Sequence, residues 1–173
     1  VRLRQELGKN GSGIGVFLSG GTRNFEKTDP LAAIYNRNAF TAVVDFSHRF
    51  SRRTYEVSGN LGYTRVAGEP ADIERLQRSS ARYFQRPDAT HVHLDPTRTK
   101  LDGGSGSVGL SKGEGRWTFE VRGGFESPEH ERNDVGSLST ADGVMGFAEL
   151  GYRQTRPGFF YSWETSIFAN GEK

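Results

Sequence analysis

The stretch YEVSGNLGYT, residues 55–64, places an apolar or small side chain at every second position and a mostly polar one between. Successive side chains of a β-strand point to opposite faces, so this period of two predicts a strand with one apolar and one polar face. The same period recurs over residues 40–47, 117–126 and 159–168. Four weaker segments, residues 1–7, 13–20, 99–111 and 144–154, complete a prediction of eight strands.

The connections between the predicted strands alternate in length along the whole chain. Short turns at 8–12, 51–53, 112–115 and 155–157 are separated by long loops at 21–37, 67–98 and 127–143. Outer-membrane β-barrels have this organisation, because every second connection is a periplasmic turn and the others are extracellular loops. The sequence therefore predicts an all-β antiparallel transmembrane β-barrel in the bacterial outer membrane. The long loops are expected on its extracellular side.

Composition narrows the classes of protein to which the chain could belong. None of the 173 residues is cysteine, which excludes disulfides and cysteine catalysis. Lys and Arg number 23 against 21 Asp and Glu, and the basic residues are scattered, so nucleic acid is not an expected partner. The hydrophobic fraction of 34% is low for a soluble domain with a core, whereas barrel strands are only weakly apolar.

Four of the predicted strands have two faces of opposite character. The apolar face comprises Phe40, Val44, Phe46, Tyr55, Val57, Leu61, Trp117, Phe119, Val121, Tyr161, Trp163 and Ile167. The charged face comprises Asp45, Arg49, Glu56, Glu120, Arg122, Glu126 and Glu164. An Arg or Lys facing lipid at the bilayer midplane costs about 2–4 kcal/mol, so the apolar face is expected to contact lipid and the charged face to line a lumen.

Aromatic residues near the predicted strand ends fit an interfacial girdle. They are Tyr63, Trp117, Tyr152 and Phe159. Alternation alone leaves one alternative open, a soluble sandwich or lipocalin-like barrel with its apolar face inward.

The long loop 67–98 contains a predicted helix over residues 70–84, with Pro70 near its start and Pro87 beyond its end. It carries a basic and aromatic cluster of candidate ligand or lumen residues, namely Arg78, Arg82, Tyr83, Phe84 and Arg86. Three roles are open for this cluster. It could form a constriction or plug in the lumen, bind lipopolysaccharide phosphate or a sugar, or pin the loop against acidic residues of the barrel wall.

Other motifs favour structural interpretations over chemical ones. The glycine-rich GKNGSGIG at 8–15 lacks the ending of a phosphate loop and indicates a tight turn. His91 and His93 lack a convincing third ligand, so no metal or other cofactor is expected. Glu120, Glu126, Glu149 and Glu164 could supply the paired carboxylates of a hydrolase, but ion pairs with Arg122 and Arg153 in the lumen are the favoured interpretation. No enzyme activity is expected.

Several blocks of sequence resemble one outer-membrane family. They are LQRSSARYFQRPDA at 76–89 and LDPTRTKLDG at 94–103, together with residues 43–50, 60–68 and 127–142. Members of that family combine an N-terminal domain like family 9 carbohydrate-binding modules with a large C-terminal β-barrel of unknown function. The resemblance covers roughly residues 39–170. It implies that this chain is an internal part of a larger barrel, and the absence of an initiator Met at Val1 favours the same interpretation.

These observations lead to a pore or transport-related outer-membrane protein for a small or glycan-derived solute as the first functional hypothesis. The alternatives are a non-conducting outer-membrane anchor that binds a partner or surface glycan, and a soluble β-sandwich or barrel that acts as a binding module. The expected partners are the lipid bilayer, lipopolysaccharide, and further strands from the same polypeptide or from another membrane subunit.

Overall fold

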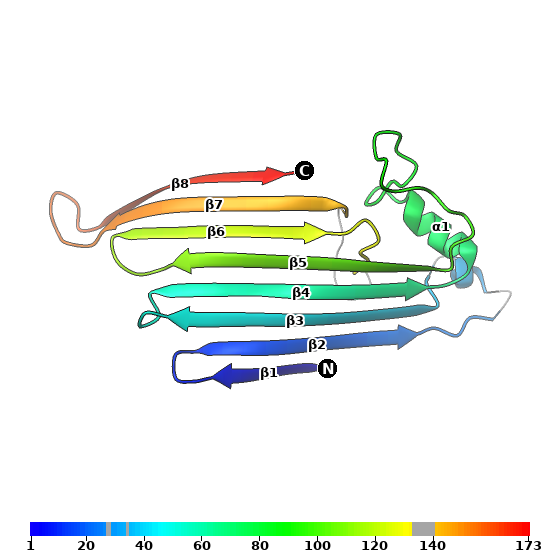
Figure 1. Ribbon diagram of the computed structural model, residues 1–173, viewed down its shortest axis with the longest axis horizontal. Coiled ribbons are helices and arrows are strands. Elements are labelled where there is room, and N and C mark those ends of the chain that lie inside the picture. The colour runs from blue at the N-terminus through cyan, green and yellow to red at the C-terminus, as the bar shows by residue number, and fades with distance from the viewer. Residues whose placement is uncertain (27–28, 34, 133–140) are drawn as a thin grey trace.

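The computed structural model describes residues 1–26, 29–33, 35–132 and 141–173. Eight strands form one antiparallel sheet in which each strand pairs with its neighbours in sequence (Figure 1). The strands are β1 Arg2–Leu7, β2 Ser12–Thr22, β3 Asn38–Phe50, β4 Tyr55–Ala67, β5 Lys100–Lys112, β6 Trp117–Glu126, β7 Gly143–Gln154 and β8 Trp163–Glu172. A short 3-10 helix, Pro30–Ala33, and one α-helix, α1 Pro70–Arg78, lie in the loops.

The sheet confirms the prediction of an all-β antiparallel fold with eight strands and one short α-helix. Most strands have ten to thirteen residues, about twice the length of an average soluble strand. The long connections meet at one end of the sheet and the short ones at the other (Figure 1). The sheet is not closed, because β1 and β8 are its two edges and do not pair with each other.

The helix is shorter than predicted, because it ends at Arg78 rather than continuing to residue 84. Ser79 ends it by leaving the helical conformation, with φ −59° and ψ 152°. The backbone N–H and the hydroxyl of Ser79 both donate to the carbonyl oxygen of Leu76, at 3.2 and 2.8 Å. A serine that bonds the preceding turn in this way competes with the continuing helix.

The last strand begins four residues later than predicted. β7 ends at Gln154, whose register partner is Trp163, so the residues before Trp163 have no facing backbone in the sheet. Phe159 and Tyr161 therefore lie in the connection between β7 and β8 and are largely exposed. The predictions of strand 159–168, of a short turn at 155–157, and of Tyr161 on the apolar face are wrong for that reason.

Strand register sorts the side chains onto two faces. We call the face that carries Val44, Leu61 and Val108 the outer face, and the opposite one the inner face. Val44 pairs with Leu61 across β3 and β4, while the next register pair, Asp45 with Asn60, lies on the inner face. One face is therefore apolar across all eight strands, and the other is mostly polar, with Phe17, Val43 and Phe147 among its apolar exceptions.

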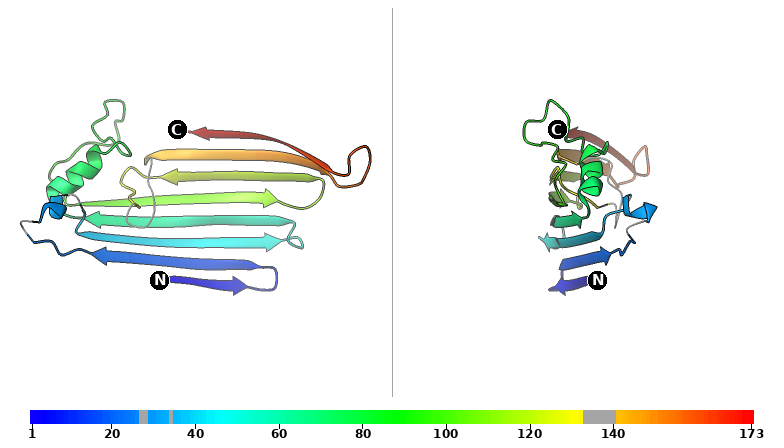
Figure 2. Two further views of the ribbon diagram at one scale, coloured as in Figure 1. Left: turned by 180° about the vertical axis from the view of Figure 1, so that it is seen from behind. Right: turned by 90° about the vertical axis from the view of Figure 1, so that its right-hand side faces the viewer.

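The long loops pack against the inner face at one end of the sheet. We call residues 68–98 together with 127–132 the cap. A buried core joins Ile73, Leu76, Phe84, Ala89 and Val92 of the cap to Val66 of β4 and Leu101 of β5. Val66 and Leu101 are register partners on the inner face, so the cap covers that face and leaves the outer one open. In Figure 2 the strands form a single layer with α1 at the long-loop end.

The described residues contain no helix that is long and apolar enough to cross a membrane. The short helix α1, with nine residues, is part of the cap core instead.

Gly103 of β5 allows the cap to lie directly on the sheet. A Cβ atom at this position would be 2.2 Å from the backbone nitrogen of His130, far inside van der Waals contact. The neighbouring Gly104 points to the outer face, where a Cβ atom would meet only a carbonyl oxygen 3.7 Å away. Glycine is therefore required at position 103, on the inner face, and is not required at position 104, on the outer face.

We expect Gly103→Ala to lift residues 127–132 from β5, at a cost of about 1–3 kcal/mol for overpacking. Amide hydrogen exchange at His130 and Glu131 should become faster, because their hydrogen bonds to Ser127 and Thr64 depend on this contact. Gly104→Ala is the matched control and should leave these amides protected. Equal protection in both variants would contradict the placement of the cap.

Candidate functional site

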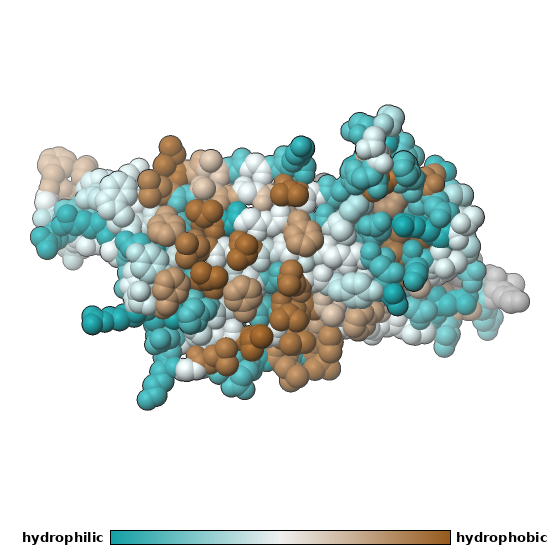
Figure 3. Space-filling model, in the orientation of Figure 1, coloured by the Kyte–Doolittle hydropathy of each residue, from teal (hydrophilic) through white to brown (hydrophobic). Residues whose placement is uncertain are grey.

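The outer face of the sheet presents a continuous apolar surface, visible in Figure 3 as hydrophobic residues that cross the strands. Its large side chains remain substantially exposed, among them Leu3, Ile14, Leu18, Phe40, Val44, Phe46, Leu61, Val108, Trp117, Val121, Phe125, Val144, Leu150, Trp163 and Ile167. Leu61, in the middle of β4, is 67% exposed. No described element covers this surface, and a contiguous apolar area of such extent marks an interaction site.

Aromatic residues gather at the short-turn end of the outer face. Phe50 stacks on Tyr55 with ring centroids 5.4 Å apart, and Tyr55 lies 6.3 Å from Phe119. Tyr152 continues the row, in contact with Trp117 at 4.8 Å and with Trp163 at 5.4 Å. The row extends from β3 to β8, and it includes the predicted girdle residues Trp117 and Tyr152.

A second aromatic pair lies toward the long-loop end, where the rings of Phe40 and Tyr63 are 6.4 Å apart. Among the strand residues that the structure describes, charged outer-face side chains occur only at the two ends of the strands. Lys100, Asp102 and Arg65 lie at the long-loop end and Lys112 at the short-turn end. The band between them is free of charge.

The height of this band can be estimated from β5. The ten residues of rise from Asp102 to Lys112 amount to about 33 Å along the strand, or about 23 Å at a tilt of about 45°. The apolar band of an outer-membrane barrel is about 25 Å tall.

Ion pairs cover the inner face. Arg2 of β1 pairs with Asp45 of β3 at 2.6 Å, and Arg49 pairs with Glu56 across β3 and β4 at 2.6 Å. Arg122 pairs with Glu120 of the same strand at 2.6 Å. These side chains are half to one-third exposed, so each pair contributes little to stability on its own. They make the inner face a hydrated, charged surface.

A buried ion pair holds the cap together. The Nη2 atom of Arg82 donates to the carboxylate of Glu131 at 2.7 Å and to the carbonyl oxygen of His130 at 2.5 Å. The side chains of Arg82 and Glu131 are 1% and 2% exposed. Loss of one partner would leave an uncompensated buried charge, which costs about 3–5 kcal/mol. The pair therefore fixes the two segments of the cap to each other.

The remaining residues of the predicted cluster have separate surroundings. Arg86 pairs with Asp142, which also accepts a hydrogen bond of 2.7 Å from His91. Arg78 is exposed and pairs with Glu74 one helical turn away at 2.8 Å. Phe84 is 2% exposed in the cap core, whereas Tyr83 is half exposed, with φ +47°. The acids that pair with Arg82 and Arg86 belong to loops rather than to strands.

Two further contacts close the cap. The side chain of Gln77, fully buried in α1, donates to the backbone oxygen of Asp95 at 2.8 Å and accepts from its N–H at 2.9 Å. His130 lies 3.2 Å from the hydroxyl of Thr64, and burial lowers its pKa. The neutral form of His130 is thus the one that the folded cap accommodates, and stability is lost as the pH falls below its unfolded value of about 6.5.

The candidate residues form two groups rather than one site. Arg78, Arg82, Tyr83, Phe84 and Arg86 lie in the cap at the long-loop end, whereas Glu120, Arg122 and Glu164 lie on the inner face nearer the short turns. The partners Glu131, Asp142 and Gln77 were missed as contacts. Arg82 and Glu131 are 49 residues apart, and no local pattern connects them.

Within residues 1–26, 29–33, 35–132 and 141–173, no three His, Asp or Glu side chains cluster as metal ligands. No family model matches the chain, and no curated protein or solved structure matches it at a significant level.

Proposed function

We propose that this chain is part of the wall of a bacterial outer-membrane β-barrel, with lipid against its outer face and a solute pathway along its inner face. The observation that carries this proposal is the charge-free band on the outer face, bounded by aromatic side chains at both ends. Lipid requires such a band, because hydrocarbon solvates neither charges nor unpaired backbone groups. Tyr and Trp rings favour the interfaces above and below it.

A soluble β-sandwich would also place an apolar face against protein, but it fits these features less well. The strands are twice the usual soluble length, and all three long loops meet at one end. In a sandwich the Tyr and Trp side chains would be spread through the core, whereas here they lie toward the ends of the strands and only Phe side chains such as Phe46 lie between. An outer face in contact with lipid accounts for the length of the strands, for the three long loops at one end of the sheet, and for the positions of the aromatic side chains.

The cap on the inner face bears on the size of the barrel. Eight strands that close on themselves leave an interior only just wide enough for side chains. The cap has its own core of at least five buried residues and would not fit there. The open edges β1 and β8 therefore pair with further strands in this proposal, from the same polypeptide or from another subunit.

The cap also shapes the proposed pathway. Because it rests on the inner face at the long-loop end, it narrows the opening on that side without filling the rest of the charged wall. We therefore favour a constricted pore for small solutes over a non-conducting anchor. The resemblance of residues 39–170 to barrels that follow a carbohydrate-binding-like domain makes a glycan-derived solute the first candidate. Lipopolysaccharide is the expected neighbour outside the barrel.

Leu61→Arg tests the lipid-facing orientation. In the full-length protein folded into lipid vesicles, we expect a loss of unfolding free energy of about 2–4 kcal/mol, because the charge would lie near the bilayer midplane. Ser58→Arg, on the inner face of the same strand, is the matched control and should cost less than about 1 kcal/mol. Equal losses for the two variants would contradict the assignment of the faces.

Arg82→Met tests the constriction. Planar bilayers that contain the full-length protein should show a small single-channel conductance, and loss of the buried pair should raise it or make it flicker as the cap loosens. Arg78→Met removes an exposed pair worth only about 0.3–0.5 kcal/mol and should behave like the wild type. If the inserted protein shows no conductance in the wild type or in either variant, the pore hypothesis is wrong and the non-conducting anchor is the better description.

A further inference from the structure

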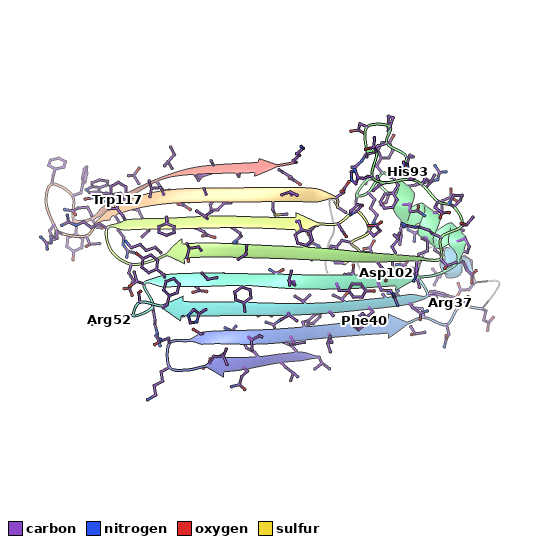
Figure 4. All side chains as sticks on the ribbon, in the orientation of Figure 1. Arg37, Phe40, Arg52, His93, Asp102 and Trp117 are labelled. Atoms are coloured by element: carbon purple, nitrogen blue, oxygen red, sulfur yellow. The ribbon has the colours of Figure 1, made fainter. Side chains whose placement is uncertain are left out.

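A polar cluster interrupts the outer face where the apolar band ends on the long-loop side. Arg65 of β4 and Asp102 of β5 are register partners there, on the same face as Leu61 and Val108. Figure 4 shows Asp102, Arg37 and Phe40 at this end of the sheet. Under the proposed function this level of the wall meets the headgroups of the outer leaflet.

One carboxylate organises the cluster. Asp102 accepts hydrogen bonds from the Tyr63 hydroxyl and from Nε of Arg65, each at 2.5 Å. The Lys100 ammonium lies 3.6 Å from the second carboxylate oxygen. Two cations thus share one anion, and the cluster keeps a net positive charge. The side chains of Arg65 and Lys100 are 49% and 59% exposed, so both remain accessible from outside.

A hollow of about 350 Å³ adjoins Arg65 on the outer face. Its lining consists of Gly20, Gly21, Thr22, Asn38, Ala39, Phe40 and Arg65. A Cβ atom at Gly20 would lie 3.7 Å from the backbone oxygen of Ala39 and from the Phe40 ring, in ordinary van der Waals contact, so the wall of the hollow here is backbone and ring edge. One side is basic and polar, and the other, at Phe40, leads into the apolar band toward Leu18.

We call the polar cluster of Tyr63, Arg65, Lys100 and Asp102, together with the adjoining hollow, the rim. We propose that the rim binds a phosphate-bearing glycolipid of the outer leaflet, with Arg65 and Lys100 at the phosphate and Phe40 beside the first acyl carbons. Arginine and lysine are the side chains that pair with phosphate oxygens. Asp102 positions Arg65 for this contact and neutralises only part of its charge. The proposal commits to a lipid rather than free phosphate, because the apolar side of the hollow would give a free ion no favourable contact. It rests on the proposed function.

The experiment uses the full-length protein in nanodiscs and diphosphorylated lipid A as the probe, with retention after delipidation measured by native mass spectrometry. Arg65→Gln combined with Lys100→Gln should lower lipid A retention at least about tenfold, equivalent to about 1.4 kcal/mol. Lys100→Gln alone removes only the exposed 3.6 Å contact with Asp102 and should not disturb folding. A partial loss of lipid A retention in this single variant can therefore be measured even if the double variant folds poorly. Arg52→Gln, at the opposite end of the sheet in Figure 4, is the control and should retain lipid A like the wild type.

Three results would overturn the proposal: unchanged retention in the double variant, an equal loss in Arg52→Gln, or equal retention of lipid A from which both phosphates have been removed. Full competition by millimolar inorganic phosphate would reassign the rim to a free anion. Failure of the wild type to enter nanodiscs at all would instead contradict the proposed function, so the two failures are distinguishable.

Discussion

The apolar outer face is the constraint on which the rest of this structure depends. A sheet with large aliphatic and aromatic side chains exposed on eight consecutive strands is not stable against water, and each such side chain contributes about 1.5–3 kcal/mol when it is covered. Because side chains alternate between the two faces along each strand, this apolar face also determines the positions of the charged side chains and of the cap. Charged side chains lie on the inner face or at the strand ends, and the cap packs on the inner face, which leaves the apolar face uncovered by described elements.

The inner face differs from the outer one because its charged side chains form ion pairs with one another. Arg49 with Glu56 and Arg122 with Glu120 pair across or along strands and stay hydrated. The cap, in contrast, buries Arg82 with Glu131 almost completely. A buried pair of this kind is weak evidence for net stability but strongly disfavours any rearrangement that separates the partners. A cap whose segments are held together on a solvent-exposed face is what the proposed constriction requires.

Much of the fold was predictable because alternation and loop length are local properties. Stretches such as 55–64 and 117–126 specify both the strand and its two faces, and the register confirms Val44, Leu61 and Val121 on one face and Asp45, Glu120 and Arg122 on the other. The end of α1 was not predictable in the same way. It depends on Ser79 bonding Leu76 rather than on the apolar spacing that continues past it.

Contacts between distant segments account for the other differences. The start of β8 depends on where β7 ends, so the apolar residues Phe159 and Tyr161 fall outside the sheet despite their pattern. The cap depends on Gly103, whose missing side chain admits the backbone of His130, and on a pair 49 residues apart in sequence. The rim at Arg65 and Asp102 likewise arises only when β4 and β5 are paired.

Spin labels along β4 would show whether lipid lies against the outer face. These 173 residues contain no cysteine, so a single cysteine introduced between residues 57 and 63 is the one labelling site within them for measurements in bilayers. We expect labels at Val57 and Leu61 to collide with oxygen and not with a water-soluble nickel chelate. Labels at Ser58, Asn60 and Gly62 should show the reverse preference. Exclusion of both reagents at the outward positions would mean that protein covers this face, and would contradict the account.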